Sequence, residues 1–215
     1  MPRWRFWQRP DPLFSGSPPN IVFRVGYKPL WTPPPPQYTG ASRFDDPLGQ
    51  YRVVYAASSQ LGCVVEILDH FRVNPAIVAA LASSEEPEDH IPPGVVPPGF
   101  FCRVTGSASL SDYFADLCHS EWLARLRRLP EHHALDTSDL QGRDRTLTQA
   151  VGHFVHEDPA AFDGIRYPSR LGHDFENLAI FDRAPITIEV DETPIRPDDL
   201  HLLQALTLLH LTLPE

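Results

Sequence analysis

Short β-branched runs and longer helically spaced segments are mixed along this chain. The runs predict strands at residues 20–27, 51–57, 100–110, 164–167, 177–181 and 184–192. Helical spacing predicts helices at residues 60–70, 74–83, 111–129, 145–157 and, with a strand as the alternative, 198–213. The order of these elements does not show the regular βαβ alternation of a doubly wound sheet.

Local signals mark several helix starts. Ser58 and Ser59 precede the segment 60–70 as N-caps, and Pro75 suits the first turn of the segment 74–83. The mixture of elements predicts an α+β fold, in which helices flank a mixed or mainly antiparallel central sheet. We expect one domain over residues 1–215, since no linker separates two periodic halves.

Proline is frequent, with 24 residues, and it clusters between the predicted elements. Each proline fixes φ and removes a hydrogen-bond donor, so these stretches are predicted to be stiff connections. Residues 1–19 are expected to form an irregular N-terminal extension. The acidic, proline-rich residues 85–99 are expected to form a loop insertion.

The charge balance narrows the class of partner. A formal net charge of -10 repels nucleic acid and anionic lipid at long range, although a local basic site can still hold a nucleotide. No apolar run is long enough for a membrane span, and the N-terminus lacks the apolar core of a signal peptide. The scattered cysteines, Cys63, Cys102 and Cys118, favour a reducing cytoplasm, and we expect them to be small core residues.

The sequence lacks the motifs of several common nucleotide-binding, metal-binding and hydrolase sites. No glycine-rich dinucleotide fingerprint or P-loop is present. His153 and His156 can share a helix face, but no zinc-ligand spacing accompanies them, so no metal site is predicted. Ser169 and His173 lie close in sequence, yet the elbow motif of serine hydrolases is missing.

One carboxylate stands inside an apolar run. Glu66 lies in "GCVVEILDHF", on a predicted helix whose buried stripe would be Leu61, Val64, Val65 and Leu68. A solvated helix position would explain it. A carboxylate in a cleft would instead require cationic or donor partners, and Arg43, Tyr55 and Ser169 are the candidates. Each candidate taken alone is an ordinary loop, core or turn residue.

Together these residues are the basis of a resemblance. The stretches "FRVGY", "GASRFDD", "YRVVYAASSQLGCVVEIL", "FDGIRYPSR" and "ENLAIFD" resemble the RES domain family over residues 23–181. The arginine, glutamate and serine of that family match Arg43, Glu66 and Ser169. Tyr55 and Arg24 match a tyrosine and a further arginine. The arginine stretch departs from the family pattern at two places, because Ser42 stands for a glycine and Asp45 for an asparagine.

The resemblance implies a fold similar to ADP-ribosyltransferase toxins and an enzyme that acts on NAD. Cleavage of the nicotinamide–ribose bond passes through an oxocarbenium-like transition state, which a carboxylate stabilises, so that role goes to Glu66. Arg43, supported by Arg24, would hold the pyrophosphate. Tyr55 would offer an aromatic face and a hydroxyl, and Ser169 would bind a phosphate or the ribose.

Tyr167 and His173 complete the expected substrate pocket. NAD enters as substrate and inorganic phosphate as a possible co-substrate, with no bound cofactor. The first hypothesis is an NAD phosphorylase or glycohydrolase, the toxin of a bacterial toxin–antitoxin pair. The second is a mono-ADP-ribosyltransferase with a protein target, and the third is a catalytically weak interaction module. The resemblance also implies an Xre-type helix-turn-helix antitoxin and a homodimer, without direct contact to nucleic acid or membrane.

Overall fold

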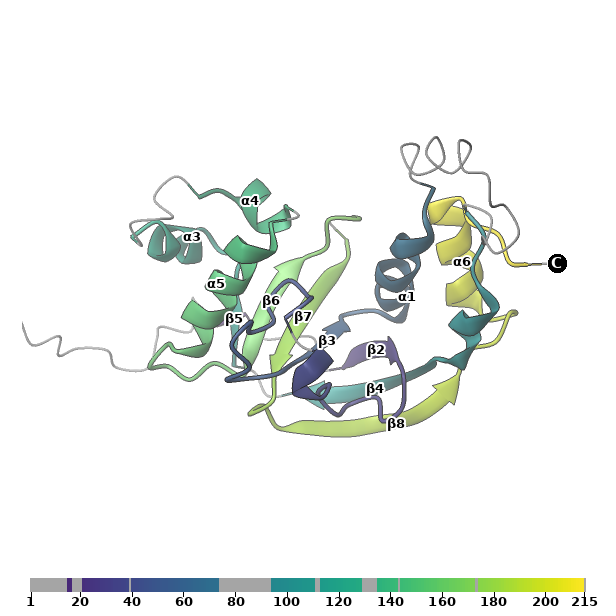
Figure 1. The fold of residues 1–215 in the computed structure, drawn as a ribbon, viewed down its shortest axis with the longest axis horizontal. Coiled ribbons are helices and arrows are strands. Elements are labelled where there is room, and N and C mark those ends of the chain that lie inside the picture. The colour runs from purple at the N-terminus through teal and green to yellow at the C-terminus, as the bar shows by residue number, and fades with distance from the viewer. Residues whose placement is uncertain are drawn as a thin grey trace, which may run out of the picture.

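A strongly curled sheet forms the centre of the molecule (Figure 1). The computed structural model describes residues 15–16, 21–38, 40–73, 94–110, 113–128, 135–142, 144–172 and 174–214. The sheet contains β1 (Ser15–Gly16), β2 (Val22–Gly26), β3 (Val53–Ala57), β4 (Val104–Leu110), β5 (Phe114–Asp116), β6 (Gly164–Pro168), β7 (Glu176–Phe181) and β8 (Ile186–Pro194). Their order is β1-β5-β6-β7-β3-β2-β4-β8. Neighbouring strands are antiparallel except β5 and β6, which run parallel.

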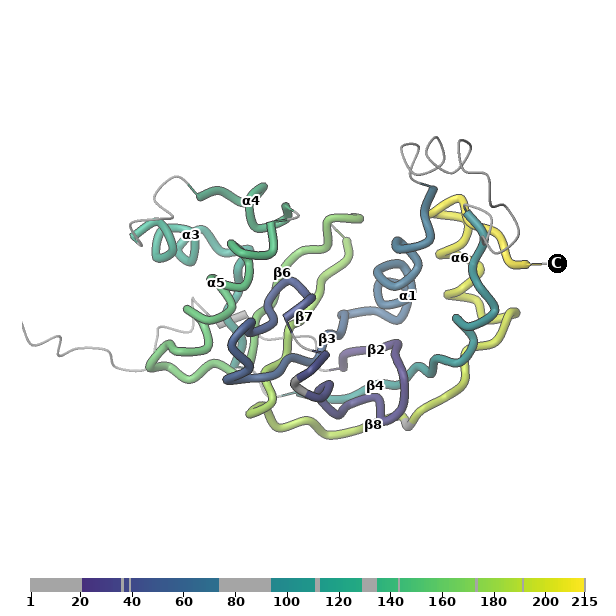
Figure 2. Tube along the Cα trace, in the orientation of Figure 1, coloured from purple at the N-terminus to yellow at the C-terminus, as the bar shows by residue number. Residues whose placement is uncertain are grey.

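The helices form two groups above this sheet (Figures 1 and 2). They are α1 (Gln60–Leu68), α3 (Ser120–Leu126), α4 (Thr137–Gln141), α5 (Arg145–His156) and α6 (Leu200–Leu209). Short 3-10 helices span Pro36–Tyr38, Asp69–Phe71 and Pro98–Cys102. α1 packs against α6 at one end of the sheet, and α3, α4 and α5 gather at the other end. The central strand β3 therefore runs beneath the space between the two groups.

The two-residue period of β3 decides what faces that space. Val53 packs in the core cluster of α5, and Ala57 packs in the cluster of α1 and α6. Val54 and Ala56 point to the opposite face, where they join a third apolar cluster. Tyr55 lies between Val53 and Ala57 on the helix side, so its ring emerges between the two helix groups.

Ser59 starts α1 as the sequence predicts. Its side chain accepts a hydrogen bond from the backbone N–H of Gly62 at 3.1 Å, which satisfies one of the free donors at the helix start. The predicted buried stripe is confirmed except at Leu61, which is only half-buried. The fully buried residues of α1 are Gly62, Cys63, Val64, Val65 and Leu68.

The predicted α+β class and most predicted elements are confirmed, including the helical form of the tail. The helix predicted at residues 111–129 is wrong in its first half. Phe114 and Ala115 are fully buried in β5 and pair with β6, and the helix starts only at Ser120, capped by His119. Helical spacing of apolar residues there was overridden by backbone pairing with a strand that lies far along the chain.

Smaller corrections concern the connections. The strand predicted from residue 100 begins at Val104, after a 3-10 helix, and α4 was not predicted. The expected irregular extension contains the short strand β1. The helix predicted at residues 74–83 and most of the 85–99 loop lie outside the described residues. Cys63 is buried, whereas Cys102 and Cys118 are exposed, so the prediction of three core cysteines is wrong for two of them. No described helix is long and apolar enough to cross a membrane.

Gly164 in β6 leaves no room for a methyl group. A Cβ there would lie 2.6 Å from a ring carbon of Phe114 and would collide with the carbonyl oxygen of Ala179 on β7. Because both groups lie in the buried sheet, Gly164→Ala should lower the free energy of unfolding by about 2 kcal/mol or more in urea denaturation. Gly99→Ala is the matched control, since a Cβ at Gly99 meets nothing within 4 Å. Equal stability of the two variants would contradict this packing.

Candidate active site

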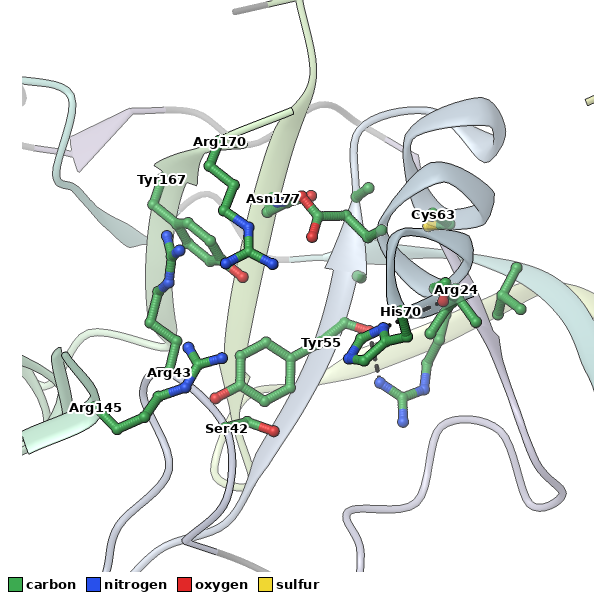
Figure 3. A pocket seen from close by; sticks show the side chains of 15 residues that line it. Arg24, Ser42, Arg43, Tyr55, Cys63, His70, Arg145, Tyr167, Arg170 and Asn177 are labelled. Atoms are coloured by element: carbon green, nitrogen blue, oxygen red, sulfur yellow. Dashed lines mark hydrogen bonds between the residues drawn. The ribbon is translucent and has the colours of Figure 1, made fainter. Parts of the chain in front are cut away.

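A cavity of about 310 Å³ opens on the helix side of the sheet, between α1 and the start of α5 (Figure 3). This volume is near the lower end of the range for ligand pockets, roughly 300–1,000 Å³. β2, β3, the loop before β3, α1, α5 and the β6–β7 region all contribute to its wall. The lining residues with polar side chains are Arg24, Ser42, Arg43, Tyr55, Cys63, Glu66, His70, Arg145, Tyr167, Arg170 and Asn177.

The cavity wall is positively charged although the chain is acidic. It carries four arginines against one carboxylate, that of Glu66, while the whole chain has a formal net charge of -10. Figure 3 shows the guanidinium groups of Arg43, Arg145 and Arg170 near Tyr167, on one side of the cavity. Arg24 lies on the other side of Tyr55. A concave wall with this charge concentrates anionic ligands.

The Glu66 carboxylate is held by two donors from the sheet. Its Oε1 accepts a hydrogen bond from the Ser169 hydroxyl at 2.6 Å and another from the Asn177 side-chain amide at 2.7 Å. Ser169 follows β6, and Asn177 lies in β7. Among the described residues, no hydrogen bond to the second oxygen, Oε2, is found. The acid in the apolar helix therefore has a fixed orientation and one oxygen free for a ligand.

Ser169 acts from behind the carboxylate. It is 2% exposed and does not belong to the cavity wall. Its hydroxyl donates to Glu66 and accepts from the backbone N–H of Leu171 at 3.0 Å. Because its one proton goes to Glu66, Ser169 orients that carboxylate in this structure, and its expected contact with phosphate or ribose stays a prediction.

Arg43 lies at the edge of the cavity and is 8% exposed. One guanidinium nitrogen donates to the carbonyl oxygen of Gln141, the last residue of α4, at 3.2 Å. The guanidinium lies 5.5 Å from the ring centre of Tyr167, a cation–π contact. Burial lowers the pKa of Arg43, and so do the positive charges of Arg145 and Arg170. Burial raises the pKa of Tyr167, which keeps its hydroxyl protonated.

Tyr55 offers its ring to the cavity but uses its hydroxyl elsewhere. The hydroxyl donates to Asp45 Oδ1 at 2.9 Å and accepts from the backbone N–H of Phe44 at 2.9 Å. Burial, together with the Asp45 charge, raises the pKa of Tyr55 well above its ordinary value. The hydroxyl is therefore engaged within the loop in this structure, while the ring lines the cavity; the expected ligand contacts of both stay predictions.

Arg24 reaches the cavity through a gap in the sheet. β2 pairs with β3 only at Phe23 and Ala57, and beyond that point a guanidinium nitrogen of Arg24 donates to the Tyr55 carbonyl at 2.5 Å. Its Nε is buried without a partner among the described residues, and burial lowers its pKa. Arg24 thus replaces missing strand pairing and also lines the cavity.

Most of the predicted site residues meet around this cavity. Arg24, Arg43, Tyr55, Glu66 and Tyr167 line it, and Ser169 touches it through Glu66, whereas His173 lies outside the described residues. Their roles in binding and catalysis stay predictions. In the part of the chain that the structure describes, no group of three His, Cys, Asp or Glu side chains could hold a metal ion.

Six polar lining residues were not predicted as site residues from the sequence: Ser42, Cys63, His70, Arg145, Arg170 and Asn177. Arg170 directly follows Ser169, and His70 ends the segment predicted as a helix, so their positions gave some signal. Arg145 is the first residue of α5, where nothing in the sequence pattern pointed to the cavity. Asn177 lies in "ENLAIFD", a stretch of the family resemblance, but no site role was predicted for it; it lines the cavity and donates a hydrogen bond to Glu66.

The hydrogen bond between the Asn177 amide and Glu66 can be tested by replacing Asn177 with aspartate, which has nearly the same shape. Asn177→Asp would place a second carboxylate at hydrogen-bond distance from Glu66 Oε1, and like charges raise the pKa of such a pair. The folded variant would then bind a proton that the unfolded chain releases above about pH 4. Its stability should therefore fall by about 1–3 kcal/mol as the pH rises from about 5 to about 8.

Thermal melting across this pH range measures the effect. Asn177→Ala is the control, because it removes the same hydrogen bond without adding charge. The loss of stability that this variant shows should not vary with pH. A flat pH profile for Asn177→Asp, like that of the alanine variant, would show that the two side chains do not interact.

Comparison with known proteins gives three results. A chain of the crystal structure of the M. tuberculosis MbcT–MbcA toxin–antitoxin complex is similar, with a TM-score of 0.47, 17% identity and coverage of 89% of each chain. No match was found among curated proteins. Residues 21–202 match the RES domain family, and this span contains the cavity, Glu66, Ser169 and the four arginines. The chain belongs to the RES domain family.

Proposed function

We propose that this protein is an NAD-consuming enzyme that cleaves the nicotinamide–ribose bond, by phosphorolysis or hydrolysis. The observation that carries the proposal is one oriented carboxylate, Glu66, in a cavity whose other charges are arginines. A dinucleotide brings a pyrophosphate, which needs cations, and a ribose that becomes positive during cleavage, which needs an anion. The cavity wall offers both.

Each side chain has a defined task in this proposal. Glu66 stabilises the oxocarbenium-like ribose through its free oxygen, while Ser169 and Asn177 keep the carboxylate oriented. Arg43 and Arg145 hold the pyrophosphate. A preorganised carboxylate needs no reorientation as positive charge develops, which is the main advantage of a fixed site over water.

We base the proposed biological role on the resemblance to the family. RES proteins resemble ADP-ribosyltransferase toxins, so we propose a cytoplasmic toxin, paired with an Xre-type helix-turn-helix antitoxin and active as a homodimer. The acceptor of the ADP-ribosyl group would be phosphate or water. Transfer to a protein side chain is the second candidate, since the same carboxylate and arginines would serve it.

The reaction is tested by incubating the purified protein with NAD, with and without inorganic phosphate, and measuring nicotinamide release. Glu66→Gln keeps the shape of the side chain but removes the charge, so turnover should fall about 100-fold or more with little change in KM. Phosphate-dependent release would identify phosphorolysis. Label transfer from NAD to protein would identify the second candidate.

Two results would count against this function. Nicotinamide release that is equal in the unaltered protein and in Glu66→Gln would remove the carboxylate from the mechanism. No release and no label transfer from well-folded protein would favour the interaction module. Growth arrest on expression that Glu66→Gln relieves would support an active enzyme in cells.

The arginines should act on binding rather than on the chemical step. Arg43→Ala and Arg145→Ala each remove a cation from the cavity wall, so KM for NAD should rise about 10-fold or more while kcat changes less. Arg52→Ala is the matched control, because Arg52 pairs with Asp182 away from the cavity. A fall in kcat with unchanged KM would contradict the binding role.

A further inference from the structure

The loop before β3 contains a buried carboxylate that receives three hydrogen bonds. Asp45 is 6% exposed. Its Oδ2 accepts from the backbone N–H groups of Gly40 at 3.0 Å and Ser42 at 2.9 Å, and its Oδ1 accepts from the Tyr55 hydroxyl at 2.9 Å. The donors lie on both sides of Arg43, so the carboxylate ties the loop of residues 40–45 to itself and to β3.

Further contacts hold this loop from the other side. The Gln149 amide of α5 donates to the carbonyl oxygens of Gly40 at 2.8 Å and Ser42 at 3.1 Å. Gly40 adopts a φ of 90°, which favours glycine. The Phe44 ring is fully buried and meets the Tyr167 ring edge-on, with centroids 4.8 Å apart. Arg43 thus projects from a loop fixed on both flanks.

The chemistry of Asp45 suits this task. An ionised carboxylate only accepts hydrogen bonds, and a buried one is stable only when donors satisfy it. Here three donors converge on Asp45. The Tyr55 hydroxyl donates its one proton in a hydrogen bond to Asp45, and its oxygen accepts a hydrogen bond from the backbone N–H of Phe44. The phenol is therefore engaged inside the loop and not in the cavity.

We propose that Asp45 and Tyr55 are positioning residues, whose mutual hydrogen bond holds the Arg43 guanidinium in place for an anionic ligand. The proposal takes the nature of that ligand, a pyrophosphate group, from the proposed function, but the positioning itself rests on the contacts of the loop. The competing explanation is that the Tyr55 hydroxyl binds the ligand directly. The two explanations differ in whether Tyr55 acts through Arg43.

A double-mutant cycle separates them. Binding of inorganic pyrophosphate is measured by calorimetry for the unaltered protein, Tyr55→Phe, Arg43→Ala and the double variant. Tyr55→Phe alone should raise Kd about 10-fold, the effect of losing a hydrogen bond to a charged group. In the Arg43→Ala background the same change should alter Kd less than about 2-fold, because no guanidinium remains to be positioned. If the protein turns over NAD, KM for NAD should follow the same pattern across the four proteins, while the effect of Tyr55→Phe on kcat should be small.

Two controls separate positioning from general loss of structure. Tyr51→Phe removes another buried hydroxyl, which donates to the Phe44 carbonyl at 3.2 Å but does not touch Asp45. It should leave Kd within about 2-fold of the unaltered protein. Asp45→Asn should recover most of the affinity lost in Asp45→Ala, because an amide oxygen can accept from Gly40 and Ser42 while its nitrogen donates to the Tyr55 oxygen.

The possible outcomes are distinct. An additive loss in both backgrounds would mean direct ligand contact by Tyr55 and would overturn the proposal, as would an equal loss in Tyr51→Phe. Unchanged affinity in both Tyr55→Phe and Asp45→Ala would also overturn it. So would an unaltered protein that binds no pyrophosphate through Arg43. If Tyr55→Phe weakens pyrophosphate binding only when Arg43 is present, but the protein does not turn over NAD, the positioning role is supported and only the proposed function is rejected.

Discussion

The hydrogen bonds to Glu66 connect the parts of this molecule that the site requires. Ser169 and Asn177 lie 103 and 111 residues from Glu66 along the chain, and both donate to the same carboxylate oxygen. These bonds link α1 to the part of the sheet formed by β6 and β7. A charged group in an apolar helix is tolerated because the sheet supplies its donors. The same bonds orient the one acid that faces the arginines.

The charge of the cavity depends on how its arginines are paired. Arg24 donates to the carbonyl of Tyr55, and Arg43 donates to the carbonyl of Gln141, so neutral main-chain groups hold both side chains. Arg170 differs, because it pairs with the Asp69 carboxylate at 2.9 Å. Carbonyl oxygens fix the guanidinium groups of Arg24 and Arg43 without cancelling their charge. The cavity therefore keeps a net positive field inside an acidic protein, which suits a ligand with several negative charges.

The two helix groups determine which side chains reach that field. β3 runs beneath both groups, and its pleat turns Tyr55 toward the gap between them. Gln149 of α5 binds the loop of residues 40–45. Gln141 of α4 accepts a hydrogen bond from the Arg43 side chain. The helices at this end of the sheet thus serve the site through contacts with one short loop.

The candidate residues could be selected from the sequence, but their partners could not. Glu66 stood out because a charge interrupts an apolar helical pattern, and Arg43 and Ser169 stood out through family resemblance. The pairing of Glu66 with Asn177 was missed, since it depends on strand register. Tyr55 was assigned a ligand-binding hydroxyl that the structure shows bonded to Asp45. The helix predicted over β5 was wrong because parallel pairing with β6 is a non-local contact.

The α+β class, the Ser59 cap and most strands and helices could be predicted from the sequence, because spacing and capping act over a few residues. The grouping of Arg43, Glu66 and Ser169 as candidate site residues came from the family resemblance. Three features depend on the folded structure: which oxygen of Glu66 accepts hydrogen bonds, where the arginines gather, and that Tyr55 and Ser169 donate to other side chains. The physical reason is that a hydrogen bond depends on geometry within a few tenths of an ångström. Sheet register and helix packing set that geometry, and no local pattern records them.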